Sequence, residues 1–160
     1  MATLMETLNV NDLNAFEQQL PPAPAPVGSY VPCIRHGDLV YTSGMIPMWN
    51  GELSCTGAVG GYGVDDEAAQ EAARHCILNA LSVIRAEIGS LQNVERIIKL
   101  TGYVNSTPAY TNQPGIINAA SNLLVDVFGD KGKHARAAVG VAALPLGASV
   151  EIDLIVQVKP

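Results

Sequence analysis

The chain has 160 residues, of which 48% are hydrophobic and 15% are charged, and its formal net charge is −6 at pH 7. This length and composition are typical of a single folded domain, and no apolar run approaches the roughly 18 residues that a membrane span needs. The acidic balance also disfavours a nucleic-acid partner, because basic side chains supply most of the affinity for phosphate backbones.

The N-terminal region predicts a short helix that leads into an extended segment. Residues 11–20 place apolar side chains at helical spacing, with an Asn or an Asp available as the N-cap. Prolines within residues 21–26 then prevent any helix from continuing. We therefore interpret residues 1–24 as an N-terminal extension with a proline-rich lead-in, and residues 25–160 as a single domain.

Two strands and a glycine-rich loop are predicted next. Residues 39–43 are rich in β-branched and aromatic side chains and predict a strand, and residues 51–56 predict a weaker partner for it. The glycines of residues 57–63 follow neither the P-loop pattern nor the dinucleotide fingerprint, so they favour a flexible connector over a phosphate site.

Two helices with a strand between them make up the middle of the chain. A helix is predicted from the capping Asp65 to Ile88, a strand over residues 94–104, and a second helix from Pro114 to Phe128. His75 lies outside the apolar stripe of the first helix, so we expect it to be solvated rather than catalytic.

The most informative stretch, residues 133–153, predicts an apolar hairpin with Arg136 at the start of one strand and Glu151 near the start of the other. Such charges in so apolar a hairpin suggest that something polar is bound there, and the planar fork of arginine suits a carboxylate. A structural ion pair, or an arginine exposed at the strand mouth, is the alternative. The last strand, residues 149–158, alternates in polarity, so Val150 and Glu151 must point to opposite faces.

This order of elements predicts an α+β fold in which a mixed sheet is covered on one face by two helices. The other face of the sheet must then be hidden, and oligomerisation is the simplest way to hide it. Cys33, Cys55 and Cys76 lack zinc-ligand spacing, so we expect free thiols and no metal. The first residues lack the features of a signal peptide, which predicts a cytoplasmic location.

Several motifs between residues 25 and 158 together resemble the Rid (reactive intermediate deaminase) or YjgF-like family. They are Gly28-Ser29-Tyr30-Val31, Tyr41-Thr42-Ser43-Gly44-Met45-Ile46-Pro47, Asn118 on the second helix, Ala135-Arg136, Leu144-Pro145 and Val150-Glu151-Ile152-Asp153. The resemblance implies a chorismate-mutase-like fold and a homotrimer with ligand sites between subunits. It also implies hydrolysis of small carboxylated enamines or imines, such as 2-aminoacrylate, to 2-keto acids and ammonia, without a metal or an organic cofactor.

The resemblance also implies roles for single residues. Arg136 would bind the substrate carboxylate, and Glu151 would orient water and transfer protons. Tyr30, Ser43 and Gly44 would line the cleft. From residue types alone, the tyrosine could equally be packing at a subunit edge, the glutamate could be solvated, and the serine could be structural.

Two further positions bear on whether the chain is an enzyme. Asn118 matches a helix asparagine for which we expect a structural or secondary role. Ala138 stands where characterised enamine deaminases often have cysteine, so only its carbonyl could contact a substrate. This difference and the altered loops leave a non-catalytic trimer that binds carboxylate metabolites or a protein as the alternative. An endoribonuclease is less favoured because the chain is acidic.

Overall fold

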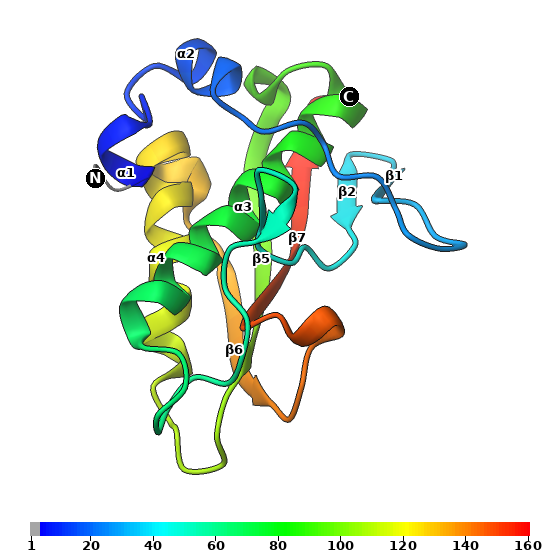
Figure 1. Ribbon diagram of the computed structural model, residues 1–160. Helices are drawn as coiled ribbons and strands as arrows, with labels where there is room; N and C mark the ends of the chain where they lie inside the picture. The colour runs from blue at the N-terminus through cyan, green and yellow to red at the C-terminus, as the bar shows by residue number, and fades with distance from the viewer. Residues whose placement is uncertain (1–3) are drawn as a thin grey trace.

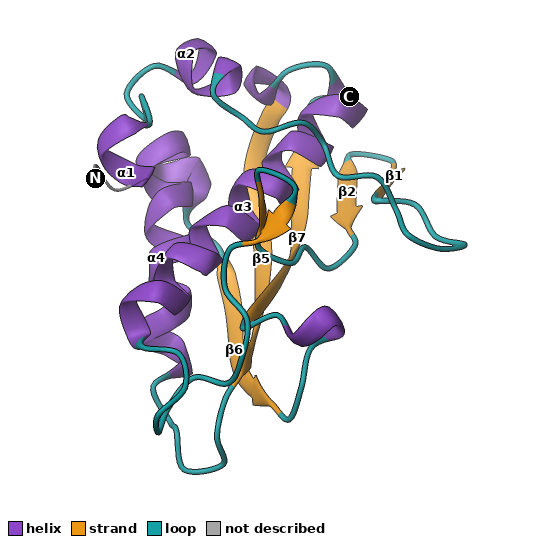
Figure 2. Ribbon diagram, in the orientation of Figure 1, coloured by secondary structure: helices purple, strands orange, loops and turns teal. Residues whose placement is uncertain are grey.

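Two long helices lie against one face of a five-stranded sheet in the computed structural model, which describes residues 4–160 (Figures 1 and 2). In spatial order the strands are β1 (Cys33–His36), β2 (Leu39–Thr42), β7 (Val150–Val158), β5 (Val94–Asn105) and β6 (Ala135–Val141). The remaining elements are α1 (Leu4–Thr7), α2 (Leu13–Gln18), the paired β3 (Met48–Trp49) and β4 (Glu52–Leu53), α3 (Asp66–Ile88) and α4 (Gln113–Phe128). The predicted α+β arrangement, with two helices on one face of a mixed sheet, is confirmed.

The two long helices begin and end where their capping residues predict. The Asp65 side chain accepts a hydrogen bond from the Ala68 amide at 2.8 Å, and α3 ends at Gly89, whose φ of 85° favours glycine. In α4 a proline lies in the first turn, and the helix ends at Gly129. None of the helices in residues 4–160 is both long and apolar enough to cross a membrane.

The hairpin predicted for residues 133–153 is wrong, because β5 lies between β6 and β7. β6 pairs with β5 in parallel, while β7 pairs with the other side of β5 in antiparallel fashion. The chain reaches β6 from β5 through α4, and a helical crossover of this kind returns the chain parallel to the strand it left. Residues 142–149 therefore pass around the end of β5 and do not close a tight turn.

The partner predicted for residues 39–43 is also wrong. β4 pairs with β3 in a small separate ladder, while β2 is flanked by β1 and β7. β1 was not predicted, because its sequence Cys-Ile-Arg-His is largely exposed and lacks a clear alternation. It pairs with β2 through a two-residue turn at Gly37 and Asp38, in which the glycine has a φ of 59°.

The face of the sheet away from α3 and α4, the open face, is uncovered in a single subunit. Alternate β7 residues from Val150 to Val158 are buried beneath the helices, as predicted, while those between them point to the open face. Ile34 on β1 is 60% exposed there, Tyr41 on β2 is 39% exposed, and Val139 on β6 is 43% exposed. These exposed apolar side chains share the open face with the charged Glu151 and Asp153 of β7, so this face is mixed in polarity.

The N-terminal residues are fixed to the end of α3. Phe16 on α2 is fully buried in the same core as the long helices. The Glu17 carboxylate accepts hydrogen bonds from the Ser90 hydroxyl and the Leu91 amide, and Arg85 donates to the Glu17 carbonyl. These contacts determine where the proline-rich segment begins to cross the molecule.

We predict that Gly102→Val destabilises the protein, because α4 packs closest to the sheet at this glycine. A Cβ at Gly102 would lie 2.5–3.0 Å from three atoms of Ile117, so overpacking should cost about 1–3 kcal/mol. Urea denaturation of this variant and of Gly28→Ala measures the difference. The control adds a methyl group in an exposed loop, and equal stability of the two variants would contradict the prediction.

Candidate active site

Arg136 projects from β6 toward α4 and is held there by neutral groups. Its Nη1 donates to Asn118 Oδ1 at 2.8 Å and to Ser121 Oγ at 3.2 Å. Its Nε and Nη2 make no hydrogen bond within residues 4–160, and no carboxylate of that region forms an ion pair with it. The guanidinium is therefore oriented without being neutralised.

A chain of hydrogen bonds continues behind this arginine. His134 Nδ1 lies 2.6 Å from the Gly132 carbonyl, so it must carry a proton and donate. In the neutral ring, Nε2 then accepts from the Ser121 hydroxyl at 3.0 Å, which leaves the hydroxyl oxygen free to accept from Arg136. We call these four residues, Arg136, Asn118, Ser121 and His134, the arginine cluster.

Glu151 lies on the open face, directly against Gly44. A Cβ at Gly44 would be 1.9 Å from Glu151 Oε1, so the absence of a side chain is what permits this approach. The carboxylate is half-buried and makes no hydrogen bond within residues 4–160. Burial raises the pKa of the Glu151 carboxyl, and the neighbouring Asp153 carboxylate raises it further.

A bulge at the end of β2 brings Ser43 and Gly44 to this position. Tyr41 pairs with Ile155, but the next bridge joins Met45 to Ile152, so one extra residue lies on the β2 side. Within the bulge, the Leu154 amide donates to the Thr42 hydroxyl at 2.9 Å in place of a ladder bond.

Ser43 connects this bulge to the loop that carries Tyr30. The Ser43 hydroxyl donates to the Val31 carbonyl at 2.7 Å, and its amide donates to the Pro32 carbonyl at 2.8 Å. The loop projects from the body beside β1 and β2 (Figure 1), and Tyr30 on it is 53% exposed. Tyr30, Ser43 and Gly44 line one cavity of about 970 Å³. With Glu151 they form what we call the glutamate cluster.

Within one subunit, Arg136 and Glu151 do not meet. Leu100 on β5 pairs with Arg136 on one side and with Leu154 on the other, so Glu151 lies three residues further along and two strands across. Strand geometry makes each offset about 10 Å. The two side chains also point to opposite faces, Arg136 toward α4 and Glu151 toward the open face.

Other site residues have clear places in this arrangement. Asn118 binds Arg136, which agrees with the structural role expected of it. Ala138 lies two residues after Arg136 on the same strand face, packed against the core. Ser121 and His134 were missed by sequence reasoning. Their spacing was the available signal, since Ser121 is one helical turn after Asn118 and His134 is two strand positions before Arg136.

The predicted solvation of His75 is wrong. The side chain is 6% exposed, stacks on Trp49 with ring centroids 4.5 Å apart, and has Nδ1 2.8 Å from Ser54 Oγ. Burial lowers the pKa of His75. His75 lies outside the apolar stripe of α3 and was therefore expected to face water. The β3–β4 ladder covers this side of the helix.

A family model described as Endoribonuclease L-PSP matches residues 21–158. The chain belongs to this family. The family includes proteins named as deaminases as well as proteins named as endoribonucleases, and the resemblance to the Rid or YjgF-like family is confirmed.

The similar proteins carry mixed names. Protein TCP17 of Trypanosoma cruzi is 42% identical over 88% of this chain and 88% of its own length. The crystal structure of Atu1372, a protein of unknown function from Agrobacterium tumefaciens, is 46% identical, with a TM-score of 0.81 over 85% of this chain and 87% of its own. A 2-iminobutanoate/2-iminopropanoate deaminase from Dermatophagoides farinae is 30% identical over 87% of this chain and 93% of its own.

We predict that Glu151→Gln stabilises the protein near neutral pH. Because the folded pKa of Glu151 is raised, the protonated form favours folding, and that contribution is lost as the pH rises through the folded pKa. The variant should have the larger free energy of unfolding at pH about 7. The difference should vanish below pH about 4, where glutamate is protonated in both states.

Urea denaturation at both pH values provides the measurement, with the exposed Glu52→Gln as the matched control. A Glu151→Gln variant that is less stable than the original protein at pH about 7 would show that the carboxylate is stabilised, not strained, in the fold.

Proposed function

We propose that the protein hydrolyses small carboxylated imines, and enamines after tautomerisation, to 2-keto acids and ammonia. In this reaction water adds to the C=N carbon, the C–N bond breaks, and one imine and one water give one keto acid and one ammonia. The observation that carries the proposal is the oriented, unneutralised Arg136. Its free Nε and Nη2 edge suits the two oxygens of a carboxylate.

Glu151 is the group suited to move the protons. A general base must take a proton from the attacking water, and the same group can then protonate the departing nitrogen. The raised pKa of the Glu151 carboxyl brings its two protonation states closer in free energy at neutral pH. Gly44, which lines the cavity, has no side chain and so allows the Glu151 carboxylate to lie directly against the wall of that cavity.

A homotrimer would supply the geometry that a single subunit lacks. Arg136 and Glu151 point to opposite faces, so a shared site needs the arginine cluster of one subunit beside the glutamate cluster of the next. The open face exposes the apolar side chains of Ile34, Tyr41 and Val139, which association would bury. Closed cyclic symmetry would repeat the same site at every interface.

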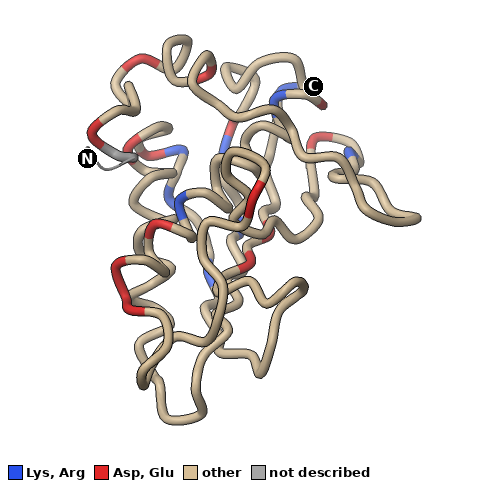
Figure 3. Tube along the Cα trace, in the orientation of Figure 1, with Lys and Arg blue, Asp and Glu red and all other residues tan. Residues whose placement is uncertain are grey.

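A trimer that binds carboxylates without turnover is the second candidate. It is favoured by Ala138, which cannot supply the thiol found at that position in many enamine deaminases. RNA cleavage is less well supported, although the family description names an endoribonuclease. Lys and Arg are scattered among Asp and Glu along the described chain (Figure 3), and the net charge is −6.

We predict that Arg136→Ala lowers kcat/KM for imine hydrolysis by about 100-fold, the value expected when a charged hydrogen-bonding partner is lost. Arg136→Lys keeps the charge but not the fork, so it should give an intermediate loss. An amino-acid oxidase generates the imine in place, and semicarbazide trapping reports how fast it disappears. Arg96→Ala, another exposed arginine, is the control and should be unaffected. No acceleration by the unaltered protein with several imino acids would leave the binding trimer as the function.

We also predict that mixing two inactive variants restores activity. Arg136→Ala and Glu151→Gln subunits, unfolded and refolded together, should regain activity at about one quarter of their sites, where an intact arginine meets an intact glutamate. Each variant refolded alone is the control. A mixture as inactive as its components, with trimers shown by sedimentation, would place both residues of each site in the same subunit.

A further inference from the structure

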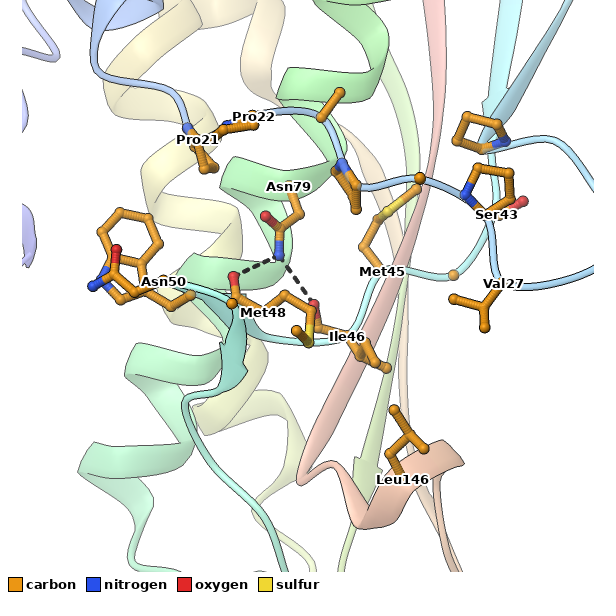
Figure 4. Close-up of a pocket in the computed structure, with 18 of the residues that line it drawn as sticks. Pro21, Pro22, Val27, Ser43, Met45, Ile46, Met48, Asn50, Asn79 and Leu146 are labelled. Atoms are coloured by element: carbon orange, nitrogen blue, oxygen red, sulfur yellow. Dashed lines mark hydrogen bonds between the residues drawn. The ribbon is translucent and has the colours of Figure 1, made fainter.

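The cavity that Ser43 and Gly44 line extends far beyond the reacting groups. Its volume of about 970 Å³ is at the upper end of the range of about 300–1,000 Å³ found for drug-sized ligands. In Figure 4, Ser43 and Val27 lie at one end, and Pro21 and Asn50 lie toward the other. A small imine such as one derived from alanine would leave most of this space empty.

The walls of the cavity are apolar and rigid. Prolines and alanines of residues 21–26 form one wall, and Met45, Ile46 and Trp49 contribute to the opposite one. Successive prolines restrict the backbone, so little freedom is lost when a ligand packs against them. The Trp49 ring is fixed from behind by its stacking on His75.

Among the polar side chains that line the cavity, Asn79 is the one that is buried. Asn79 on α3 is 3% exposed and lines the cavity. Its amide nitrogen donates to the Ile46 carbonyl at 3.1 Å and to the Met48 carbonyl at 2.9 Å (Figure 4). Two carbonyl partners fix which atom of the amide is nitrogen. Asn79 Oδ1 is therefore an acceptor of fixed orientation, and it has no donor among residues 4–160.

The wall depends on a segment outside the family match. That match begins at residue 21, whereas the proline wall is anchored by Phe16 on α2 and by the Pro21 carbonyl, which accepts from the Ser82 hydroxyl at 2.8 Å. Arg136 and Glu151 lie within the matched residues, as does the proline wall itself, while Phe16, which helps to anchor that wall, lies before them.

We propose that this cavity receives the side chain of the substrate, and that preferred substrates are imino acids with an aromatic side chain bearing a hydrogen-bond donor, such as a phenol. The inference rests on the proposed function. The carboxylate and the reacting carbon would lie near Gly44 and Glu151, the ring would pack between the proline wall and Trp49, and the donor would reach Asn79 Oδ1.

Calorimetric titration of the intact oligomer with three stable acids tests the cavity without turnover. 3-(4-Hydroxyphenyl)propanoate should bind at least about tenfold more tightly than propanoate, because a buried ring adds more than 1.4 kcal/mol. Its methyl ether should lose about tenfold, because Asn79 Oδ1 is then buried without a donor. Trp49 is the only tryptophan in the sequence, so its fluorescence should change on binding.

Filling the cavity provides the matched variants. Ala23 and Ala25 line it and are otherwise exposed, so Ala23→Phe or Ala25→Phe should remove the preference for the aromatic acid. Ala86→Phe, an exposed position on α3 away from the cavity, should not. Equal affinity for the three acids, or a preference that survives both filling variants, would overturn the inference.

Turnover separates this inference from the proposed function. Hydrolysis of the alanine-derived imine with no preference for the tyrosine-derived one would overturn the cavity assignment and leave deamination standing. The expected binding pattern without hydrolysis of any imine would support the cavity as a site for aromatic carboxylates and overturn the enzyme.

Discussion

The central strand β5 is the constraint on which the rest of the structure depends. This strand of 12 residues pairs with β7 over Val94–Val104 and, on its other side, with β6 over Lys99–Asn105. Since α4 connects β5 to β6 in parallel, Arg136 faces the helices, while Glu151, on the far side of β5, faces away from them. No local movement of side chains joins two groups on opposite faces of a sheet. A single subunit therefore does not bring the two groups together in one site.

The way in which Arg136 is held determines what it can bind. An arginine paired with a carboxylate is already neutralised, and a second anion gains little from it. Asn118 and Ser121 instead fix the guanidinium through uncharged acceptors, and His134 orients the serine hydroxyl behind it. The ion pair left open by the sequence is absent from residues 4–160, and an arginine held in this way differs from one that is merely solvated. The Arg136 guanidinium therefore retains its positive charge and has a fixed orientation, and both favour the binding of an anionic ligand.

Local signals in the sequence were sufficient for the ends of α3 and for the two faces of β7. Asp65 and Gly89 mark the ends of α3, and the alternation of β7 separates Glu151 from the buried Val150. Strand pairing between β6 and β7 is not a local property, so the sequence predicts a hairpin for two strands that β5 in fact separates. His75 was misplaced for a similar reason, since its cover comes from the distant β3–β4 ladder. Arg136 and Glu151 stand out in the sequence as charges in an apolar stretch, and the motif resemblance added Tyr30, Ser43 and Gly44. The separation of Arg136 from Glu151 across the sheet could be seen only in the fold.

Under the proposed function, selectivity and chemistry would occupy different parts of this molecule. The carboxylate and the C=N group are common to every imino acid, so contacts to them cannot distinguish one substrate from another. Discrimination between imino acids therefore depends on their side chains. Burial of each methylene group contributes about 0.8 kcal/mol of binding free energy, and a buried hydrogen-bond donor that meets a fixed acceptor contributes more to the discrimination. The sheet carries Arg136 and Glu151, whereas part of the support for the wall of the large cavity comes from α2, outside the family match. Under that proposal, changes in the N-terminal segment would alter substrate choice, because they alter the support of the cavity wall and leave the positions of Arg136 and Glu151 on the sheet unchanged.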